Sequence, residues 1–377
     1  MKKKTLGLYL HIPFCLSKCR YCDFCSYPAM AAETKHAYTM ALIKELSSRA
    51  EAAKDYVVDT VFFGGGTPTC LDTDDLLRLA DCIQSRYRLS DGVEWTSEAN
   101  PATVDKDKLR AMRACGFNRI SLGMQSAHDS ELSLLGRAHR TSDLYQAREA
   151  IHEAGFTNLN LDLMFGIPAQ TVDSFDRSLD EALALEPTHV SVYSLQIEEG
   201  TPFYREQNTL ALPSEDEERE MAALLYRKTE AAGYRRYEIS NFAKPGHESR
   251  HNLRYWRMQD YLGFGIAAHS CFEGERFYNR EELAAYLKEP CELCEQEETL
   301  TAREREYETV MLGLRLSDGI DEEDFLRTFG YGFYEKYKRR LMRFCEAGFA
   351  TFDGKRTALT ESGMAVSNAI LAEILED

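Results

Sequence analysis

The sequence of 377 residues has no apolar segment long enough to cross a bilayer, no low-complexity tract and no internal repeat beyond alternating strand and helix patterns. Its first residues, Met1 to Thr5, lead into a short strand pattern and not into the apolar segment of a secretory signal peptide. We therefore expect a cytoplasmic protein, with transient membrane contact left open. Because the cytoplasm is reducing, its 11 cysteines should be free or metal-bound rather than paired.

Positive charge is scarce. The chain has 45 Lys and Arg residues against 62 Asp and Glu residues, which gives a net charge of −17. Such a surface repels nucleic acid and disfavours a DNA- or RNA-modifying role. With 44% hydrophobic and 28% charged residues the composition is that of a globular protein, and the length predicts two domains or one barrel with an appendage.

Short apolar segments alternate with amphipathic helical patterns over the first half of the chain. This alternation predicts parallel strand–helix–strand units, because a parallel strand needs a crossover before the next. Six units fit an α/β fold with an open, partial (β/α)6 barrel over residues 1–200, in which the chemistry lies at the carboxyl ends of the strands. The expected strands are Leu6–Ile12, Tyr56–Phe63, Val93–Ser97, Arg119–Gly123, Leu159–Phe165 and His189–Leu195.

The second half of the chain follows a different pattern. Residues 201–290 are expected to form an irregular extension with one strong helix, and an acidic run at 289–298 is a candidate linker. Residues 301–377 combine helical patterns with two short strand patterns, which predicts a mostly helical, winged-helix-like domain. That shape often binds DNA, but a fold alone does not establish a function.

Cys15, Cys19 and Cys22 form a C-x3-C-x2-C motif directly after the first expected strand. Three thiolates in one tight loop can hold one face of an iron–sulfur cluster and leave a fourth iron open to a small molecule. A zinc knuckle or a structural group of reduced thiols is the alternative. Zinc usually takes four ligands, and a fourth is not evident in the sequence.

Polar residues and glycines recur where successive expected strands end. A glycine-rich turn, Gly64 to Thr67, follows the second strand, and a Ser-Glu-Ala-Asn-Pro box containing Glu98 follows the third. Gln125 and Arg137 follow the fourth strand, and Asp162 lies in the fifth. Because the carboxyl ends of parallel strands share one rim, these groups should converge on a binding site for a polar ligand.

With these motifs in this order, the sequence resembles the radical S-adenosylmethionine superfamily, in the branch of oxygen-independent coproporphyrinogen oxidases and their relatives. The resemblance implies that Cys15, Cys19 and Cys22 ligate a [4Fe–4S] cluster whose open iron binds S-adenosylmethionine. It also implies an electron donor and places the radical chemistry on the cofactor, so no side chain is assigned a catalytic role. The residues that match cofactor-contacting positions are Tyr9, Gly65, Gly66, Thr67, Glu98, Gln125, Arg137 and Asp162.

Two features separate this chain from the decarboxylating oxidases. Those enzymes carry a further cysteine two residues after the third ligand, where this chain has Phe24; Cys25 follows one place later. They also carry a longer N-terminal arm, whereas only fourteen residues precede Cys15 here. Both features resemble the subfamily of HemW-like haem chaperones, which bind haem and hand it to haem proteins.

The segment His251-Asn-Leu-Arg-Tyr255-Trp256 matches the H-N-x-x-Y-W pattern of that subfamily. Imidazole is a common axial ligand of haem iron, and Tyr255 and Trp256 offer flat surfaces for a macrocycle. These three residues are therefore candidate haem contacts, with His269 as a weaker second ligand candidate. The alternative is that His251 is satisfied by hydrogen bonds and that Trp256 belongs to the core.

The resemblance favours a haem chaperone that transfers haem to acceptor haem proteins, with respiratory cytochromes as candidate acceptors. The alternative is oxygen-independent coproporphyrinogen III dehydrogenase, which converts two propionates into vinyl groups. Two further alternatives are a radical enzyme acting on another tetrapyrrole and a nucleic-acid modifier. No nucleic-acid partner is expected, and a homodimer is left open.

Overall fold

The computed structural model describes residues 4–297 and 299–376. Its centre is a run of six parallel strands in which each is hydrogen-bonded to the next one along the chain. The sheet is open, with other strands at its two edges, so the predicted α/β fold with a partial barrel is confirmed. The six strands are β1 (Thr5–Ile12), β4 (Val57–Gly65), β5 (Leu89–Ala99), β6 (Arg119–Gln125), β7 (Asn158–Phe165) and β8 (His189–Ser194).

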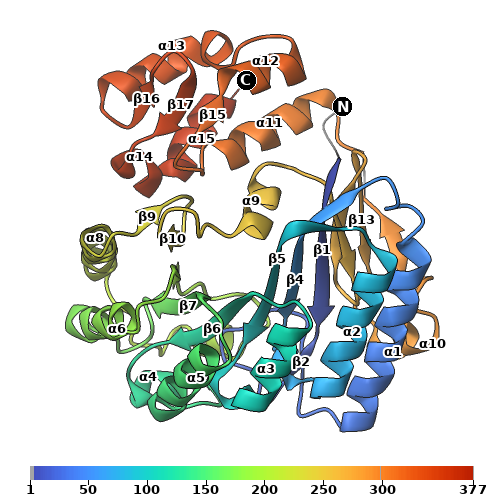
Figure 1. The fold of residues 1–377 in the computed structure, drawn as a ribbon. Coiled ribbons are helices and arrows are strands. Elements are labelled where there is room, and N and C mark those ends of the chain that lie inside the picture. The colour runs from blue at the N-terminus through green and yellow to red at the C-terminus, as the bar shows by residue number, and fades with distance from the viewer. Residues whose placement is uncertain (1–3, 298, 377) are drawn as a thin grey trace.

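Residues on these strands alternate between two environments. Leu8, Val61 and Leu122 belong to a hydrophobic core that lies between the strands and the surrounding helices. Glu98 pairs in register with Ser121, and Asp162 pairs with Ser191, so polar side chains share the opposite face. The helices of this part are α1 (Ala32–Arg49), α2 (Thr73–Arg86), α3 (Lys106–Ala114), α4 (Asp129–Leu134), α5 (Thr141–Glu153) and α6 (Val172–Ala184), and they lie outside the barrel (Figure 1).

The interval 201–290 is more regular than the sequence pattern indicated. All of its described strands join the same sheet, which reaches twelve strands because β11 pairs in parallel with β1 and β10 pairs antiparallel with β8. The acidic run contains β14, the edge strand; Glu298, within that run, lies outside the described residues. The elements here are α7 (Pro202–Glu206), α8 (Glu215–Ala231), β9 (Arg235–Arg236), β10 (Asn241–Ala243), α9 (Arg250–Trp256), β11 (Tyr261–Phe264), β12 (His269–Phe272), β13 (Glu275–Asn279), α10 (Leu283–Lys288) and β14 (Cys294–Gln296).

The last part of the chain has its own hydrophobic core, which includes Phe325, Phe333 and Leu341. It sits next to α9, at the end of the barrel where β1 begins (Figure 1). A hydrogen bond from Ser317 N to Tyr237 O (3.0 Å) is among the contacts that attach it to the barrel. Its elements are α11 (Ala302–Gly313), β15 (Ile320–Asp321), α12 (Glu322–Phe329), α13 (Phe333–Glu346), β16 (Ala350–Phe352), β17 (Arg356–Leu359), α14 (Glu361–Ala365) and α15 (Ser367–Leu375), so the predicted helical domain with a small sheet is confirmed.

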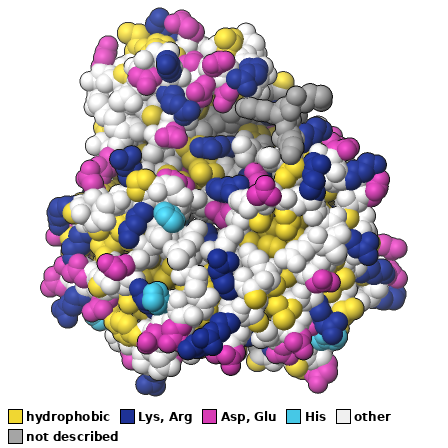
Figure 2. Space-filling view, in the orientation of Figure 1, with side chains coloured by type: hydrophobic (Ala, Val, Ile, Leu, Met, Phe, Trp, Pro, Cys, Tyr) yellow, Lys and Arg dark blue, Asp and Glu magenta, His cyan; other side chains and the backbone are white. Residues whose placement is uncertain are grey.

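Two surface properties bear on the expected partners. Acidic and basic side chains are interspersed over the face drawn in Figure 2, so no field of a single sign covers it. Among the described residues, no helix combines the length and the apolar character that a membrane span requires.

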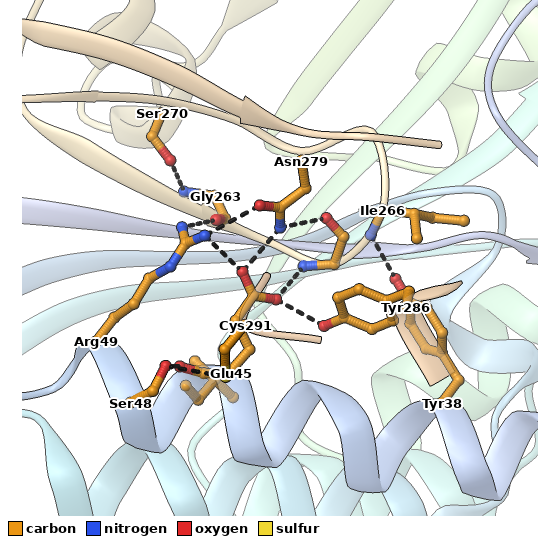
Figure 3. A network of polar contacts seen from close by, with 12 residues as sticks. Tyr38, Glu45, Ser48, Arg49, Gly263, Ile266, Ser270, Asn279, Tyr286 and Cys291 are labelled. Carbon is orange, nitrogen blue, oxygen red and sulfur yellow. Dashed lines mark hydrogen bonds and ion pairs between the residues drawn. The ribbon is translucent and has the colours of Figure 1, made fainter. Parts of the chain in front are cut away.

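A buried carboxylate joins α1 to the distant strands β11 and β13 (Figure 3). Glu45 is 0% exposed and accepts hydrogen bonds from Gly265 N (2.9 Å), Asn279 Nδ2 (2.8 Å) and the Tyr286 hydroxyl (2.6 Å). Arg49, one turn further along α1, forms an ion pair with it (2.8 Å). Burial raises the pKa of Glu45 in spite of these partners. The network therefore fixes the first helix against the segment that extends the sheet.

Replacing Glu45 by alanine is expected to lower the free energy of unfolding by about 3–5 kcal/mol, because it leaves a half-buried arginine and several buried donors without their acceptor. Urea unfolding would measure this loss. The control is Glu51→Ala, since Glu51 forms an exposed pair with Lys54 and its loss should cost less than about 0.5 kcal/mol. Equal losses for the two variants would contradict a structural role for the network.

Candidate functional site

The rim formed by the carboxyl ends of the strands surrounds a cavity of about 440 Å³. The cysteines of the motif and most residues predicted to contact S-adenosylmethionine line this one cavity, although they come from five separate segments of the chain. The predicted residues that line it are Cys15, Cys19, Cys22, Gly65, Gly66, Thr67, Glu98, Gln125, Arg137 and Asp162. The convergence expected from the strand ends is therefore present.

The loop that carries the cysteines is tied to its surroundings through its backbone. After β1, β2 (Phe14–Cys15) pairs with β3 (Tyr27–Pro28), which closes the loop at its base. Within the loop, Arg20 N donates to Leu135 O (2.9 Å). The imidazole of His11 contacts the carbonyl of Cys25 through Nε2 (2.9 Å), and burial lowers the pKa of His11. These bonds hold the cysteine loop over the barrel before any cofactor binds.

The thiols of the motif have polar neighbours from other strands. The Thr67 hydroxyl donates to Cys15 Sγ (3.7 Å), and Arg137 Nη1 donates to Cys19 Sγ (3.5 Å). Burial raises the pKa of Cys15, and raises that of Cys22 to about 11. Both thiols therefore stay protonated at neutral pH, and an iron ion that bound them would displace their protons.

Among the described residues, no three His, Cys, Asp or Glu side chains form the ligand set of a single metal ion. A four-iron cluster makes a different demand, because its thiolates bind separate irons and need only surround a space. Three cysteines around one cavity, beside the cation of Arg137, fit this donor set.

The glycine-rich turn packs directly against the cysteine loop. A Cβ atom on Gly66 would lie 2.8 Å from Phe14 O, and Gly65 has a φ of 105°, which favours glycine. Gly66 N donates to Ile12 O (2.9 Å), and Thr67 N donates to Phe14 O (2.7 Å). The glycines are therefore required for the close approach of the loop as well as for lining the cavity.

Two buried carboxyl groups face the cavity from β5 and β7. Glu98 accepts a hydrogen bond from Gly65 N (3.1 Å), and Asp162 accepts from the Ser121 hydroxyl (3.1 Å) and from Asn160 Nδ2 (2.8 Å). Burial, reinforced by the neighbouring Asp162, raises the pKa of Glu98 to about 8. Burial also raises the pKa of Asp162. At neutral pH the side chain of Glu98 is therefore mostly protonated and uncharged.

The end of β6 departs from regular strand geometry. Gln125 has a φ of 63°, and its pairing with β7 shifts by one residue after Gly123. Arg137 Nη2 donates to the carbonyl of Gly123 (3.0 Å), while its buried Nε has no hydrogen-bond partner among the described residues. Backbone strain and unsatisfied buried donors are more frequent at functional sites than elsewhere.

Tyr9 and the predicted haem contacts of the H-N-x-x-Y-W motif do not line this first cavity. Tyr9, His251 and Tyr255 line a second cavity of about 300 Å³ inside the barrel, and Trp256 lines a third of about 430 Å³ together with Leu312 of α11. Helix α9, which carries the motif, lies towards the end of the barrel where β1 begins, away from the cysteine loop near β2 (Figure 1). The predicted site residues therefore form two groups.

His251 is completely buried, and both of its ring nitrogens are engaged. Nδ1 lies 2.9 Å from the Thr60 hydroxyl, and Nε2 lies 2.8 Å from the Tyr255 hydroxyl. Burial and the nearby guanidinium groups of Arg254 and Arg119 lower the pKa of His251 to about 3. The imidazole is thus neutral, and an iron atom could reach Nε2 only after Tyr255 moves. His269, the weaker candidate, is exposed on β12 and pairs with Glu297 (2.8 Å).

Sequence reasoning did not single out two polar residues inside the barrel. Arg119 at the start of β6 and Asn160 on β7 both line the second cavity. A search for polar residues at alternating positions of the expected strands would have found them. Cys25, in contrast, is not among the residues that line the first cavity, whereas Phe24 is.

The comparisons with known proteins agree with this geometry. The profile of the Radical SAM superfamily matches residues 9–182, and that of the HemN C-terminal domain matches residues 300–366. The heme chaperone HemW of Bacillus subtilis is 36% identical over 97% of this chain and 98% of its own length, and that of Lactococcus lactis is 34% identical over 100% and 99%. Coproporphyrinogen III oxidase (HemN) of Escherichia coli has the same fold, with a TM-score of 0.86, 24% identity, and 99% of this chain and 90% of that chain covered.

The open barrel and its cysteine-lined cavity define a radical S-adenosylmethionine protein, and a [4Fe–4S] cluster and S-adenosylmethionine are its cofactors. Within that superfamily the chain belongs to the HemW family, because it shares 34–36% identity with these relatives over nearly its whole length. The predicted resemblance is confirmed.

Glu98 should make the stability of the apoprotein depend on pH. The folded protein keeps a proton on this carboxyl up to about pH 8, whereas the unfolded chain releases it near pH 4.5. The contribution of Glu98 to the free energy of unfolding therefore falls as the pH rises through this window, by up to about 1.4 kcal/mol per pH unit, and levels off above pH 8.

Glu98→Gln removes this titration, so the variant should gain stability relative to the wild type between pH 5 and pH 8. Urea unfolding of both apoproteins at several pH values would measure the gain, with Glu51→Gln as the control at an exposed position. Parallel pH profiles for wild type and Glu98→Gln would show that the buried carboxyl does not retain its proton.

Proposed function

We propose that this chain is a haem chaperone, which binds haem and transfers it to acceptor haem proteins from a radical S-adenosylmethionine core. The observation that carries this proposal is the near full-length identity to relatives named heme chaperone HemW. The aromatic cavity beside Trp256 and Tyr255 supports it, because flat apolar side chains suit a macrocycle. The decarboxylating oxidase shares the fold at 24% identity, and a shared fold does not carry its activity to this chain.

At the first cavity, we propose that Cys15, Cys19 and Cys22 hold the cluster and that the remaining lining residues hold S-adenosylmethionine. The cofactor supplies reductive cleavage of its sulfonium when an electron donor reduces the cluster. The protein's own contribution is positional. The backbone of the glycine-rich turn can approach the ligand closely, Arg137 places a cation beside Cys19, and Asp162 is held by Ser121 and Asn160.

At the other end of the barrel, we propose that Trp256 and Tyr255 contact the macrocycle. His251 supports Tyr255 through the 2.8 Å hydrogen bond, and it becomes an axial ligand only in a conformation in which Tyr255 turns aside. Such a conformation exposes a nitrogen that is otherwise satisfied, so iron binding would have to offset the loss of that hydrogen bond.

The acceptors proposed for the haem are haem proteins in general, with respiratory cytochromes as the first to test. Transfer to a membrane cytochrome would require transient contact with a membrane. An electron donor is needed for cluster reduction, and a homodimer is a further proposal that sizing of the purified protein would test.

Cys19→Ala should abolish the cluster, because two cysteines of the loop cannot hold three irons. Iron content and the absorbance of the anaerobically reconstituted variant would report the loss. Cys25→Ala is the matched control, since Cys25 belongs to the same loop but does not line the cavity, and it should keep the cluster. A Cys19→Ala variant with a full complement of iron would overturn the ligand assignment.

The function itself is tested by offering haem and coproporphyrinogen III in parallel to the reconstituted protein with a reductant and S-adenosylmethionine. The expected result is a shift of the haem absorption band without decarboxylated product in the mass spectrum. Trp256→Ala and His251→Ala should weaken haem binding and leave the cluster absorbance unchanged, whereas Tyr145→Ala, at an exposed position on α5, should change neither. Production of protoporphyrinogen IX would replace the chaperone proposal by the oxidase.

A further inference from the structure

A buried cation inside the barrel forms no ion pair with any of the described residues. Arg119 is 2% exposed, and its Nε has no hydrogen-bond partner among the described residues. No ion pair joins it to a carboxylate of the described residues, although its charge lowers the pKa of Glu98 and of Asp162. Arg119 lines the second cavity, the one of about 300 Å³ inside the barrel. Since a buried charge is costly unless it is paired, this position calls for an acceptor from outside the chain.

The acidic groups around the same cavity are already satisfied by neutral donors. Asp162 accepts hydrogen bonds from Ser121 (3.1 Å) and Asn160 (2.8 Å), and Glu98 accepts from Gly65 N (3.1 Å). Burial raises the pKa of both carboxyl groups, and the charge of Arg119 acts on both in the opposite direction. The remaining polar groups that line this cavity are uncharged, so Arg119 is the only cation among the described residues that line it, and its Nε lacks a hydrogen-bond partner among them.

The second cavity adjoins the aromatic one. Both are lined by Tyr193, Asn252 and Tyr255, and the outer one adds Trp256 and Leu312. The outer cavity measures about 430 Å³ and the inner one about 300 Å³, at the lower end of the range in which proteins bind small ligands. A ligand with a flat apolar body and an anionic arm matches this pair, with the body outside and the arm inside.

We propose that Arg119 binds a carboxylate of the tetrapyrrole, one propionate of haem, whose macrocycle lies in the outer cavity against Trp256. The proposal rests on the haem-binding function proposed above. A guanidinium group binds a carboxylate through two parallel, charge-assisted hydrogen bonds, which fixes orientation as well as adding affinity. Arg119 is thus a specificity residue that distinguishes an acidic tetrapyrrole from a neutral one.

The test is a binding cycle that crosses haem and its dimethyl ester with wild type and Arg119→Gln, using the holoprotein and the haem absorption band as the readout. Wild type should bind haem about 10- to 100-fold more tightly than the ester, the equivalent of about 1.5–3 kcal/mol for a charged hydrogen bond. Arg119→Gln should lose this preference by weakening haem binding and leaving ester binding unchanged. Arg113→Gln, at an exposed position on α3, is the matched control and should keep the preference.

Two failures are distinguishable. A wild-type protein that binds neither ligand overturns the haem-binding function itself. Haem binding in which wild type and Arg119→Gln prefer haem over the ester equally overturns only the role of Arg119, and water would then be its partner in the cavity. If Arg119→Gln does not fold, Arg119→Lys decides, because it keeps the charge without the two-pronged geometry: a reduced preference supports the proposal, and an unchanged one overturns it.

Discussion

A polar interior in an open barrel is the constraint on which the rest of the structure depends. The apolar side chains of the six strands point outwards and form the core with the helices, while Glu98, Arg119, Asn160 and Asp162 occupy cavities on the inner side. Such groups are costly to bury unless partners satisfy them. Three parts of the chain cover this interior: the cysteine loop lies at one end, α9 lies at the other, and the C-terminal domain lies beyond α9 (Figure 1). They enclose a space lined by charged and polar side chains, and some buried atoms of these side chains have no hydrogen-bond partner among the described residues.

The enclosure has two ends with different chemistry. The cysteine end combines thiols, glycine backbone and buried carboxyl groups. The α9 end combines Tyr255 and Trp256 of α9 with Leu312 of the C-terminal domain. Tyr193 lines all three cavities, so the inner cavity lies between the two ends and shares a wall with each of them.

The sequence predicts those elements whose local hydrophobic pattern also reflects their place in the folded structure. The six strands lie within a few residues of their expected bounds because buried parallel strands are apolar runs between helical patterns. The short strands β9 to β14 escaped notice, since their pairing depends on partners such as β1 and β8 that are distant in sequence. The motif alone also does not predict the burial of His251. Its hydrogen bonds to Thr60 and Tyr255 form only when α9 packs against β4. Arg119 looked like an ordinary first residue of a strand, and only the register shows which way it faces.

At Phe24 and Cys25 the cysteine loop departs from the pattern that we expect of the oxidases. Phe24 lines the cysteine cavity and is 63% exposed, so an apolar ring occupies the place from which the oxidases present a fourth cysteine. Cys25 instead packs against the hydrophobic core, with its carbonyl bonded to His11. Among the described residues lining that cavity there are thus three thiols and no fourth. The cofactor chemistry can persist in this loop while the substrate contacts change. If haem binds as proposed, its contacts lie at the α9 end, where the aromatic cavity and Arg119 are found.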